Sequence, residues 1–155
     1  MSRIIPLTQV SFADVEHIEQ ACFQPPWSAA ILNLYMNNPD NLCLGMVAGE
    51  SLQGFAIFSR FETESELLQI AVAEEYRGRG IASQLLSAAH VQLEQLGVTD
   101  ILLEVSATNS AAVTLYKKHG YRQDGCRKDY YVTPQGKQDA WLMRLGLSAA
   151  GKEKE

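Results

Sequence analysis

The glycine-containing segment from Arg77 to Ala82 carries the clearest chemical signal in this sequence. It reads Arg77-Gly78-Arg79-Gly80-Ile81-Ala82, after an apolar run at 67–72 and before a helical pattern at 81–96. Glycines let a backbone approach a ligand closely, and a helix start offers unpaired N–H groups at the positive end of its dipole. The segment therefore predicts a seat for phosphates, and with it a cofactor that carries a pyrophosphate.

Later in the sequence, Glu104 and Tyr116 have the chemistry of a proton acceptor and a proton donor. Glu104 interrupts the apolar run 101–105, where a charge without a partner is costly, so it is a candidate general base. Tyr116 follows Asn109, which is placed to cap a helix, and a tyrosine with an ordinary pKa near 10 can donate a proton at neutral pH. The plain alternatives are a glutamate that reaches solvent at the end of the sheet and a core tyrosine with a bonded hydroxyl.

A single carboxylate suits some amines better than others. A free α-ammonium has a pKa of about 7.7–8.0, against about 10.4 for lysine, so a useful fraction of α-amine is uncharged at neutral pH. One general base is then sufficient for an N-terminal amine.

Two familiar phosphate-binding patterns fit the glycine segment poorly. A P-loop requires Gly-Lys-Ser or Gly-Lys-Thr, and neither occurs in the sequence. A dinucleotide fold requires a third glycine directly after a strand, but Ser83 occupies that place and 73–77 intervene.

The spacing of Arg77, Gly80 and Ala82 instead fits [R/Q]-x-x-G-x-[G/A], and Asn109, Leu115-Tyr116 and Gly120-Tyr121 follow in order. On these motifs the chain resembles the GNAT superfamily of acetyl-CoA-dependent N-acetyltransferases. The resemblance implies an α/β fold with a mixed, mostly antiparallel sheet, parallel and splayed fourth and fifth strands, and flanking helices. It also implies acetyl-CoA as the acetyl donor, bound between those two strands, and no metal.

The resemblance also implies roles for individual residues. Glu104 would remove the proton of the amine and Tyr116 would return one to sulfur, with direct transfer in a ternary complex. The cofactor-binding residues would be Ile70, Ala71, Val72, Arg77, Gly78, Arg79, Gly80, Ile81, Ala82 and Asn109.

Further short motifs are similar to one branch of the superfamily, the enzymes that acetylate N-termini of ribosomal proteins. The similarity runs up to Leu145, with departures at Ser106 and Asp129, where that branch usually has Arg and Asn. It implies that the acceptor is the N-terminal peptide of a basic ribosomal protein, namely the alanine that begins small-subunit protein eighteen. Trp27, Tyr130 and Tyr131 would flank its groove. The motifs are Pro26-Trp27-Ser28, Ile70-Ala71-Val72, Leu103-Glu104-Val105, Tyr130-Tyr131 and Asp139-Ala140.

Periodicity and turn signals predict the element order β-α-α-β-β-β-α-β-α-β-β, with a crossover between the fourth and fifth strands. The predicted apolar face of the long helix is Ile81, Leu85, Leu86, Ala89 and Leu93. We expect one domain over 1–145 and a frayed tail over 146–155.

Composition narrows the function classes. The 155 residues carry a formal net charge of −5, which argues against broad nucleic-acid binding. Three scattered cysteines and no long apolar segment predict a cytoplasmic protein that does not bind membranes. We also expect a monomer or weak dimer. His17, His90 and His119 lack metal-ligand spacing. A lysine or small-amine acetyltransferase and a non-catalytic acetyl-CoA-binding module remain as alternatives.

Overall fold

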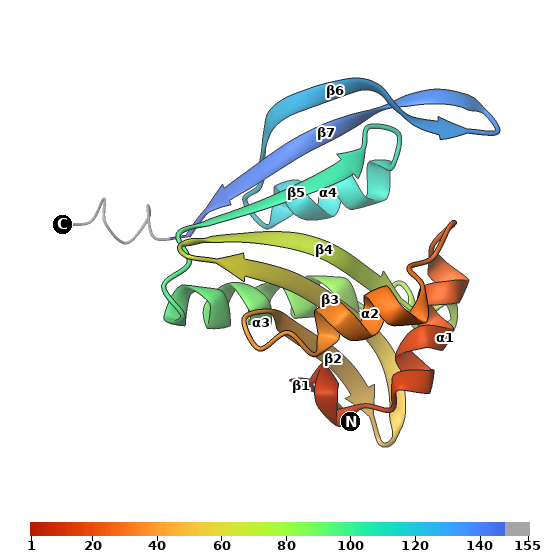
Figure 1. Ribbon diagram of the computed structural model, residues 1–155, viewed down its shortest axis with the longest axis vertical. Coiled ribbons are helices and arrows are strands. Elements are labelled where there is room, and N and C mark those ends of the chain that lie inside the picture. Colours follow the sequence, from red (N-terminus) through yellow and green to blue (C-terminus); the bar gives the residue numbers. More distant parts are fainter. Residues whose placement is uncertain (148–155) are drawn as a thin grey trace.

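A computed structural model describes residues 1–147 and has the predicted order of helices and strands, with two added 3₁₀ turns (Figure 1). The elements are β1 (Ser2–Pro6), η1 (Leu7–Gln9), α1 (Phe12–Cys22), α2 (Ala29–Met36), β2 (Leu42–Ala48), β3 (Ser51–Phe61), β4 (Glu64–Val72), η2 (Glu74–Tyr76), α3 (Ile81–Gln95), β5 (Asp100–Ser106), α4 (Ser110–Lys118), β6 (Arg122–Thr133) and β7 (Gly136–Gly146).

All seven strands belong to one sheet, in the order β1-β2-β3-β4-β5-β7-β6. Every neighbouring pair is antiparallel except β4 and β5, which α3 connects and which run parallel. The mixed, mostly antiparallel GNAT-type sheet predicted from the sequence is confirmed.

The parallel pairing of β4 and β5 ends after three residues. Its register joins Glu64 to Asp100, Ser65 to Ile101 and Glu66 to Leu102. Both strands then continue without pairing to each other. The register of β4 against β3 shifts just beyond this point, because Phe58 faces Leu67 whereas Ile57 faces Gln69. Leu68 is thus an extra residue in a β-bulge, and a bulge bends its strand. Figure 1 shows the two strands diverging from a common end.

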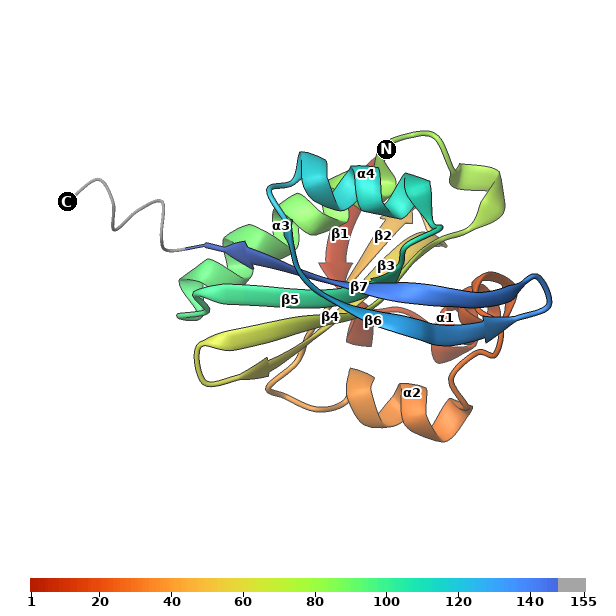
Figure 2. The same cartoon turned by 90° about the horizontal axis from the view of Figure 1, so that it is seen from above.

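Helices cover the two faces of the sheet unequally (Figure 2). On one face, α3 and α4 enclose a core that includes Phe58, Leu86, Ile101 and Met143. On the other face, α1 and α2 pack over a second core around Phe55. Side chains alternate along β5, so its odd-numbered residues enter the first core and Leu102, Glu104 and Ser106 face the opposite side.

Local signals explain most of the helix boundaries. The side chain of Ser28 accepts a bond from the Ile31 amide at 3.2 Å, and Asn109 caps α4 by accepting from the Ala112 amide at 3.3 Å. Ser11 precedes α1 but forms no such side-chain bond. The five residues predicted for the buried face of α3 are the five that are buried.

The face predicted for α4 is partly wrong. The spacing of Ala112, Leu115, Tyr116 and His119 predicts that they share the inner side of this helix, but only Tyr116 is buried, together with Val113. The short helix lies across an open part of the sheet, so its periodicity alone fixed its inner face poorly.

The C-terminal strand extends slightly beyond the predicted domain end. Gly146 pairs with Asp100, and the Leu147 amide donates to the Thr99 carbonyl at 2.7 Å. The remainder of the predicted tail, 148–155, lies outside the described residues. Among residues 1–147, no helix is long and apolar enough to cross a membrane.

We predict that Gly54→Ala destabilises the fold. Gly54 pairs with Val72 across β3 and β4, and an added Cβ would lie 2.7 Å from the Ala71 carbonyl oxygen. Backbone must shift to relieve such a contact, at a cost of about 1–3 kcal/mol. Denaturant unfolding measures this change, with Ser51→Ala on the same strand as the control. An unchanged midpoint for Gly54→Ala would contradict the tight packing of β3 on β4.

Candidate active site

The separation of β4 and β5 opens a cleft of about 1020 Å³. Its walls come from six parts of the chain: the end of α1, β4, the glycine segment with the start of α3, β5, α4 and β6. Of the predicted site residues, twelve line it, namely Ile70, Ala71, Val72, Arg77, Gly78, Gly80, Ile81, Ala82, Glu104, Asn109, Tyr116 and Tyr131. Arg79, Trp27 and Tyr130 are not among its lining residues.

The glycine segment forms one end of the cleft. Gly78 and Gly80 have φ of 80° and 78°, a left-handed conformation that residues with a Cβ rarely adopt. Gly80 is the N-cap of α3, and its carbonyl accepts the Gln84 amide at 3.0 Å. The amides of residues 81–83, in the first turn of α3, have no carbonyl one turn earlier to which they could donate. The segment therefore presents N–H groups to the cleft, as an anion site requires.

Two arginines brace this segment. The Arg77 Nε donates to the Val72 carbonyl at 3.0 Å, and its Nη2 donates to the Cys22 sulfur at 3.4 Å. Arg79 turns the other way, with its guanidinium carbon 5.4 Å from the centre of the Tyr76 ring. Arg77 thus ties the segment to the end of β4, whereas Arg79 holds the outer turn.

Free strand edges form the long walls of the cleft. Residues 70–72 pair with β3 on one side, but beyond Glu66 β4 has no pairing with β5 on the other. Likewise Leu103 to Ser106 pair with β7 but not with β4. Unpaired main-chain groups on such edges can bind an extended ligand as an added strand would.

Glu104 lies on the face of β5 that α3 and α4 leave uncovered. Its side chain is 25% exposed, and one carboxylate oxygen lies 3.5 Å from the Nε of Arg127 on β6. The Tyr131 hydroxyl forms a hydrogen bond with the same carboxylate. Burial, followed by the charge of Glu104, raises the pKa of Tyr131, so this hydroxyl stays protonated at neutral pH.

Glu66 is a second carboxylate at this place, and the sequence analysis missed it. It stands opposite Leu102 at the last parallel pair, on the same face as Glu104, which is two residues further along β5. Burial raises the pKa of Glu66, the charge of Glu104 raises it further, and Arg127 lowers it. In the sequence, Glu66 shows only the alternation of polar and apolar residues with Leu67 that is typical of a strand. This pattern does not reveal that β5 lies beside it.

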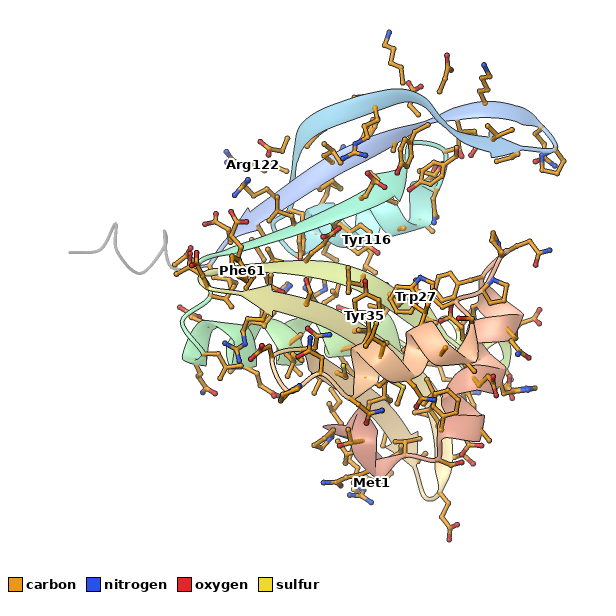
Figure 3. The ribbon with its side chains drawn as sticks, in the orientation of Figure 1. Met1, Trp27, Tyr35, Phe61, Tyr116 and Arg122 are labelled. Carbon is orange, nitrogen blue, oxygen red and sulfur yellow. The ribbon has the colours of Figure 1, made fainter. Side chains whose placement is uncertain are left out.

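Tyr116 approaches the cleft from the opposite side of the sheet. It is 7% exposed, and Figure 3 shows it below α4, beside the gap between β5 and β4. Burial raises the pKa of Tyr116 to about 12. The hydroxyl is therefore fully protonated at neutral pH.

A cluster of polar rings fixes the end of α4 against α3. The Tyr121 hydroxyl and His90 Nε2 are 2.8 Å apart, and Ser83 Oγ lies 2.7 Å from His119 Nε2. Burial and the charge of Lys118 lower the pKa of His119, although it caps the end of α4. Burial, followed by the charge of His119, lowers the pKa of His90 to about 4. Both imidazoles are therefore held in their uncharged form at neutral pH. Tyr116 packs edge-on against Tyr121.

A fully buried glutamate anchors the loop that carries Trp27. Glu19 on α1 accepts the Trp27 amide at 2.9 Å and the Gln69 side-chain amide at 2.6 Å, both on one oxygen. Trp27 stacks on Tyr35 with ring centres 4.8 Å apart, and Figure 3 shows the two rings together at the α1–α2 side of the molecule. Through Gln69 this aromatic pair is linked to β4, one wall of the cleft.

On the opposite rim, β6 carries an irregular segment between Arg127 and Tyr131. Asp129 has φ of 54°, and its amide donates to an Asp139 carboxylate oxygen at 2.9 Å. Tyr130 is 48% exposed and packs edge-on against Tyr131. The predicted aromatic residues therefore stand on two rims, but only Tyr131 reaches the cleft lining.

Within residues 1–147, no group of three or more His, Cys, Asp and Glu side chains is arranged to hold a metal ion. The cleft instead offers backbone amides, two strand edges, carboxylates and a buried phenol. This set suits an anionic, extended co-substrate and a proton-transfer reaction, which is the chemistry of acyl transfer from a coenzyme thioester to an amine.

Comparisons with known proteins agree with this class. Residues 12–121 match the Acetyltransferase (GNAT) family. The [ribosomal protein bS18]-alanine N-acetyltransferase of Salmonella typhimurium is 34% identical over 149 residues, covering 96% of this chain and 99% of its own. The enzyme of the same name from Haemophilus influenzae is 35% identical over 138 residues, covering 88% and 92%.

A solved structure gives the same result. The ribosomal-protein-S18-alanine N-acetyltransferase of Escherichia coli superposes with a TM-score of 0.89 at 31% identity, over 95% of this chain and 94% of that one. The chain belongs to the GNAT acetyltransferase family and is an N-acetyltransferase.

We predict that Glu19→Gln weakens the pH dependence of stability. Burial raises the pKa of Glu19 above its ordinary value of 4.5, so the folded state favours the neutral carboxyl. Its contribution is full below the unfolded-state pKa and is lost as the pH rises through the folded-state pKa. Between about pH 5 and about pH 8, the melting temperature should therefore fall more for wild type than for Glu19→Gln.

Glu16→Gln, a partly exposed carboxylate of the same helix, is the matched control for this measurement. It should follow wild type. An equal fall in melting temperature for wild type and Glu19→Gln would contradict the inference that the Glu19 carboxylate is costly to bury in its charged form.

Proposed function

We propose that this protein transfers acetyl from acetyl-CoA to the N-terminal α-amine of a ribosomal protein, the alanine of bS18. The observation that carries the proposal is a continuous cleft that joins the glycine segment, the free edges of β4 and β5, Glu104 and Tyr116. The names of the relatives from three bacteria supply the acceptor.

The residues present fit acetyl-CoA. The amides from Arg77 to Ala82, with Gly78 and Gly80 in left-handed conformation, suit the pyrophosphate. The edge at 70–72 suits the pantetheine arm, whose amides can pair as a strand would. In this proposal a main-chain N–H of that edge polarises the thioester carbonyl. Asn109 adds a contact to the coenzyme while its side chain caps α4.

Proton transfers follow from the positions of Glu104 and Tyr116 on opposite faces of the split sheet. Glu104 removes a proton from the ammonium, directly or through water, and the amine nitrogen then attacks the thioester carbon. The C–S bond breaks as the C–N bond is completed, the electron pair leaves on sulfur, and the nitrogen loses its second proton to water. Acetyl thus passes directly in a ternary complex, without an acyl-enzyme.

Burial sets how Tyr116 acts. A thiol has a reference pKa of about 8.5, whereas Tyr116 has a pKa of about 12. Complete proton transfer to a fully formed thiolate is therefore uphill by roughly three to four pH units. The hydroxyl instead stabilises the sulfur by a hydrogen bond as charge develops there, gives its proton to the sulfur as CoA departs, and regains one from water.

The rims of the cleft suit a peptide acceptor. Trp27 with Tyr35 stands on one rim, and Tyr130 with Tyr131 on the other. An extended N-terminal segment between them would present its first residue to Glu104. The chain's net charge of −5 favours association with a basic segment, in a salt-dependent manner.

We predict that Glu104→Gln and Tyr116→Phe each lower kcat by about 10²–10⁴-fold, the usual effect of losing a general base or acid. A thiol-release assay with an alanine-initiated peptide measures this. Glu64→Gln at the exposed start of β4 and Tyr121→Phe, whose hydroxyl binds His90, are the matched controls. Near-wild-type turnover in both site variants would refute the roles, and ping-pong kinetics would refute direct transfer.

We predict that cells lacking this chain contain bS18 whose intact mass is lower by about 42 Da, the mass of one acetyl group. Mass spectrometry of ribosomal proteins, followed by peptide mapping, locates the change. Loss of acetyl from a lysine with every N-terminus unchanged would replace the α-amine assignment by the lysine alternative. CoA release without any added amine, or none with a broad peptide panel, would favour a binding module.

A further inference from the structure

A cation of the protein itself lies beside Glu104, the residue to which the proposed function brings the acceptor amine. The Nε of Arg127 lies 3.5 Å from the Glu104 carboxylate, and its guanidinium carbon is 5.2 Å from the centre of the Tyr130 ring. Its side chain is 54% exposed, and it lies beside the cleft rather than among its lining residues.

The field of Arg127 reaches Glu66 and Glu104, two carboxylates that line the cleft. It lowers the pKa of Glu66, partly offsetting the effects of burial and of the Glu104 charge. It also lowers the pKa of Tyr131, against larger effects of burial and Glu104. Arg127 therefore acts as the counter-charge of the group formed by Glu66 on β4, Glu104 on β5 and Tyr131 on β6.

The backbone of β6 is shaped to place this arginine. Arg127 faces Ala140 and Tyr131 faces Gln138, so three residues of β6 stand against the single residue Asp139 of β7. The Asp129 amide bonds to the Asp139 carboxylate within this bulge. A bulge re-aims the side chains beside it, and here both Arg127 and Tyr131 reach Glu104.

We propose that Arg127 is a specificity-determining residue that disfavours protonated amines beside Glu104 and thereby selects α-amines over lysine side chains. This inference rests on the proposed function. An incoming ammonium must approach a carboxylate that already holds a guanidinium, and two cations beside one carboxylate repel each other. A neutral amine meets no such repulsion. Glu104 takes the proton of the ammonium through water before the amine closes on Arg127, and because an α-ammonium has a lower pKa than a lysine, it gives up that proton more readily and gains the advantage.

The test compares Arg127→Gln with wild type on two peptides of one sequence. One has a free N-terminal alanine, and the other has a blocked N-terminus and a single lysine. In Arg127→Gln, KM for the lysine peptide should fall by about fivefold at low salt, the effect of one partly exposed charge, and kcat for the alanine peptide should change little. The preference for the alanine peptide should fall accordingly.

Salt and a conservative variant separate this role from a structural one. Screening should shrink the difference between wild type and Arg127→Gln as ionic strength rises, whereas a packing defect would persist. Arg127→Lys keeps the cation and should keep the wild-type preference. Arg122→Gln, on the same strand but at its opposite end from the β6–β7 turn, is the matched control (Figure 3).

The inference is overturned if Arg127→Gln keeps the wild-type preference for the alanine peptide over the lysine peptide at low salt. It is also overturned if Arg127→Lys loses that preference as Arg127→Gln does. Failure of the proposed function is recognised separately, because wild type would then leave the alanine peptide unacetylated, whether or not it acetylates the lysine peptide. Equilibrium binding of the lysine peptide in the presence of CoA would still test Arg127, and a variant that binds no more tightly than wild type would overturn the inference.

Discussion

The whole site depends on the point at which β4 and β5 stop pairing. Three parallel pairs hold the strands together, and a bulge at Leu68 then turns β4 away while β5 follows β7. The break leaves two strand edges without partners, which is unfavourable for a soluble protein unless something else binds them. In a GNAT acetyltransferase the substrate itself can satisfy those edges. The sheet is therefore incomplete as folded, and its missing hydrogen bonds become binding groups.

The same break lets the two faces of the sheet contribute to one reaction centre. Tyr116 comes from the face covered by α3 and α4, whereas Glu66 and Glu104 belong to the other face. In an unbroken sheet, the backbone of two strands would separate these groups. Because the strands diverge, a donor bound from one side and an acceptor from the other can meet between them.

The sequence predicts the parts of this site that are local and misses those that depend on contacts across the sheet. The glycine segment, the cap at Asn109 and the buried face of α3 follow from short-range patterns, so they were predicted. The bulge at Leu68 is set by the register of β4 on β3, which periodicity does not encode. Glu66 and Arg127 join Glu104 only after three strands have assembled. Glu19 was part of a helical pattern, and its bonds to Trp27 and Gln69 span three elements.

Burial divides the work between the two proton-transfer groups. Tyr116 is almost fully enclosed, and its pKa of about 12 keeps the proton on the hydroxyl until charge develops on a neighbour. Glu104 is a quarter exposed and lies 3.5 Å from the Nε of Arg127, in contact with solvent. Under the proposed function, the acid belongs to the buried part of the cleft and the base to its solvent-exposed part, where an acceptor would arrive. The depth of each residue in the split sheet is thus part of the chemistry.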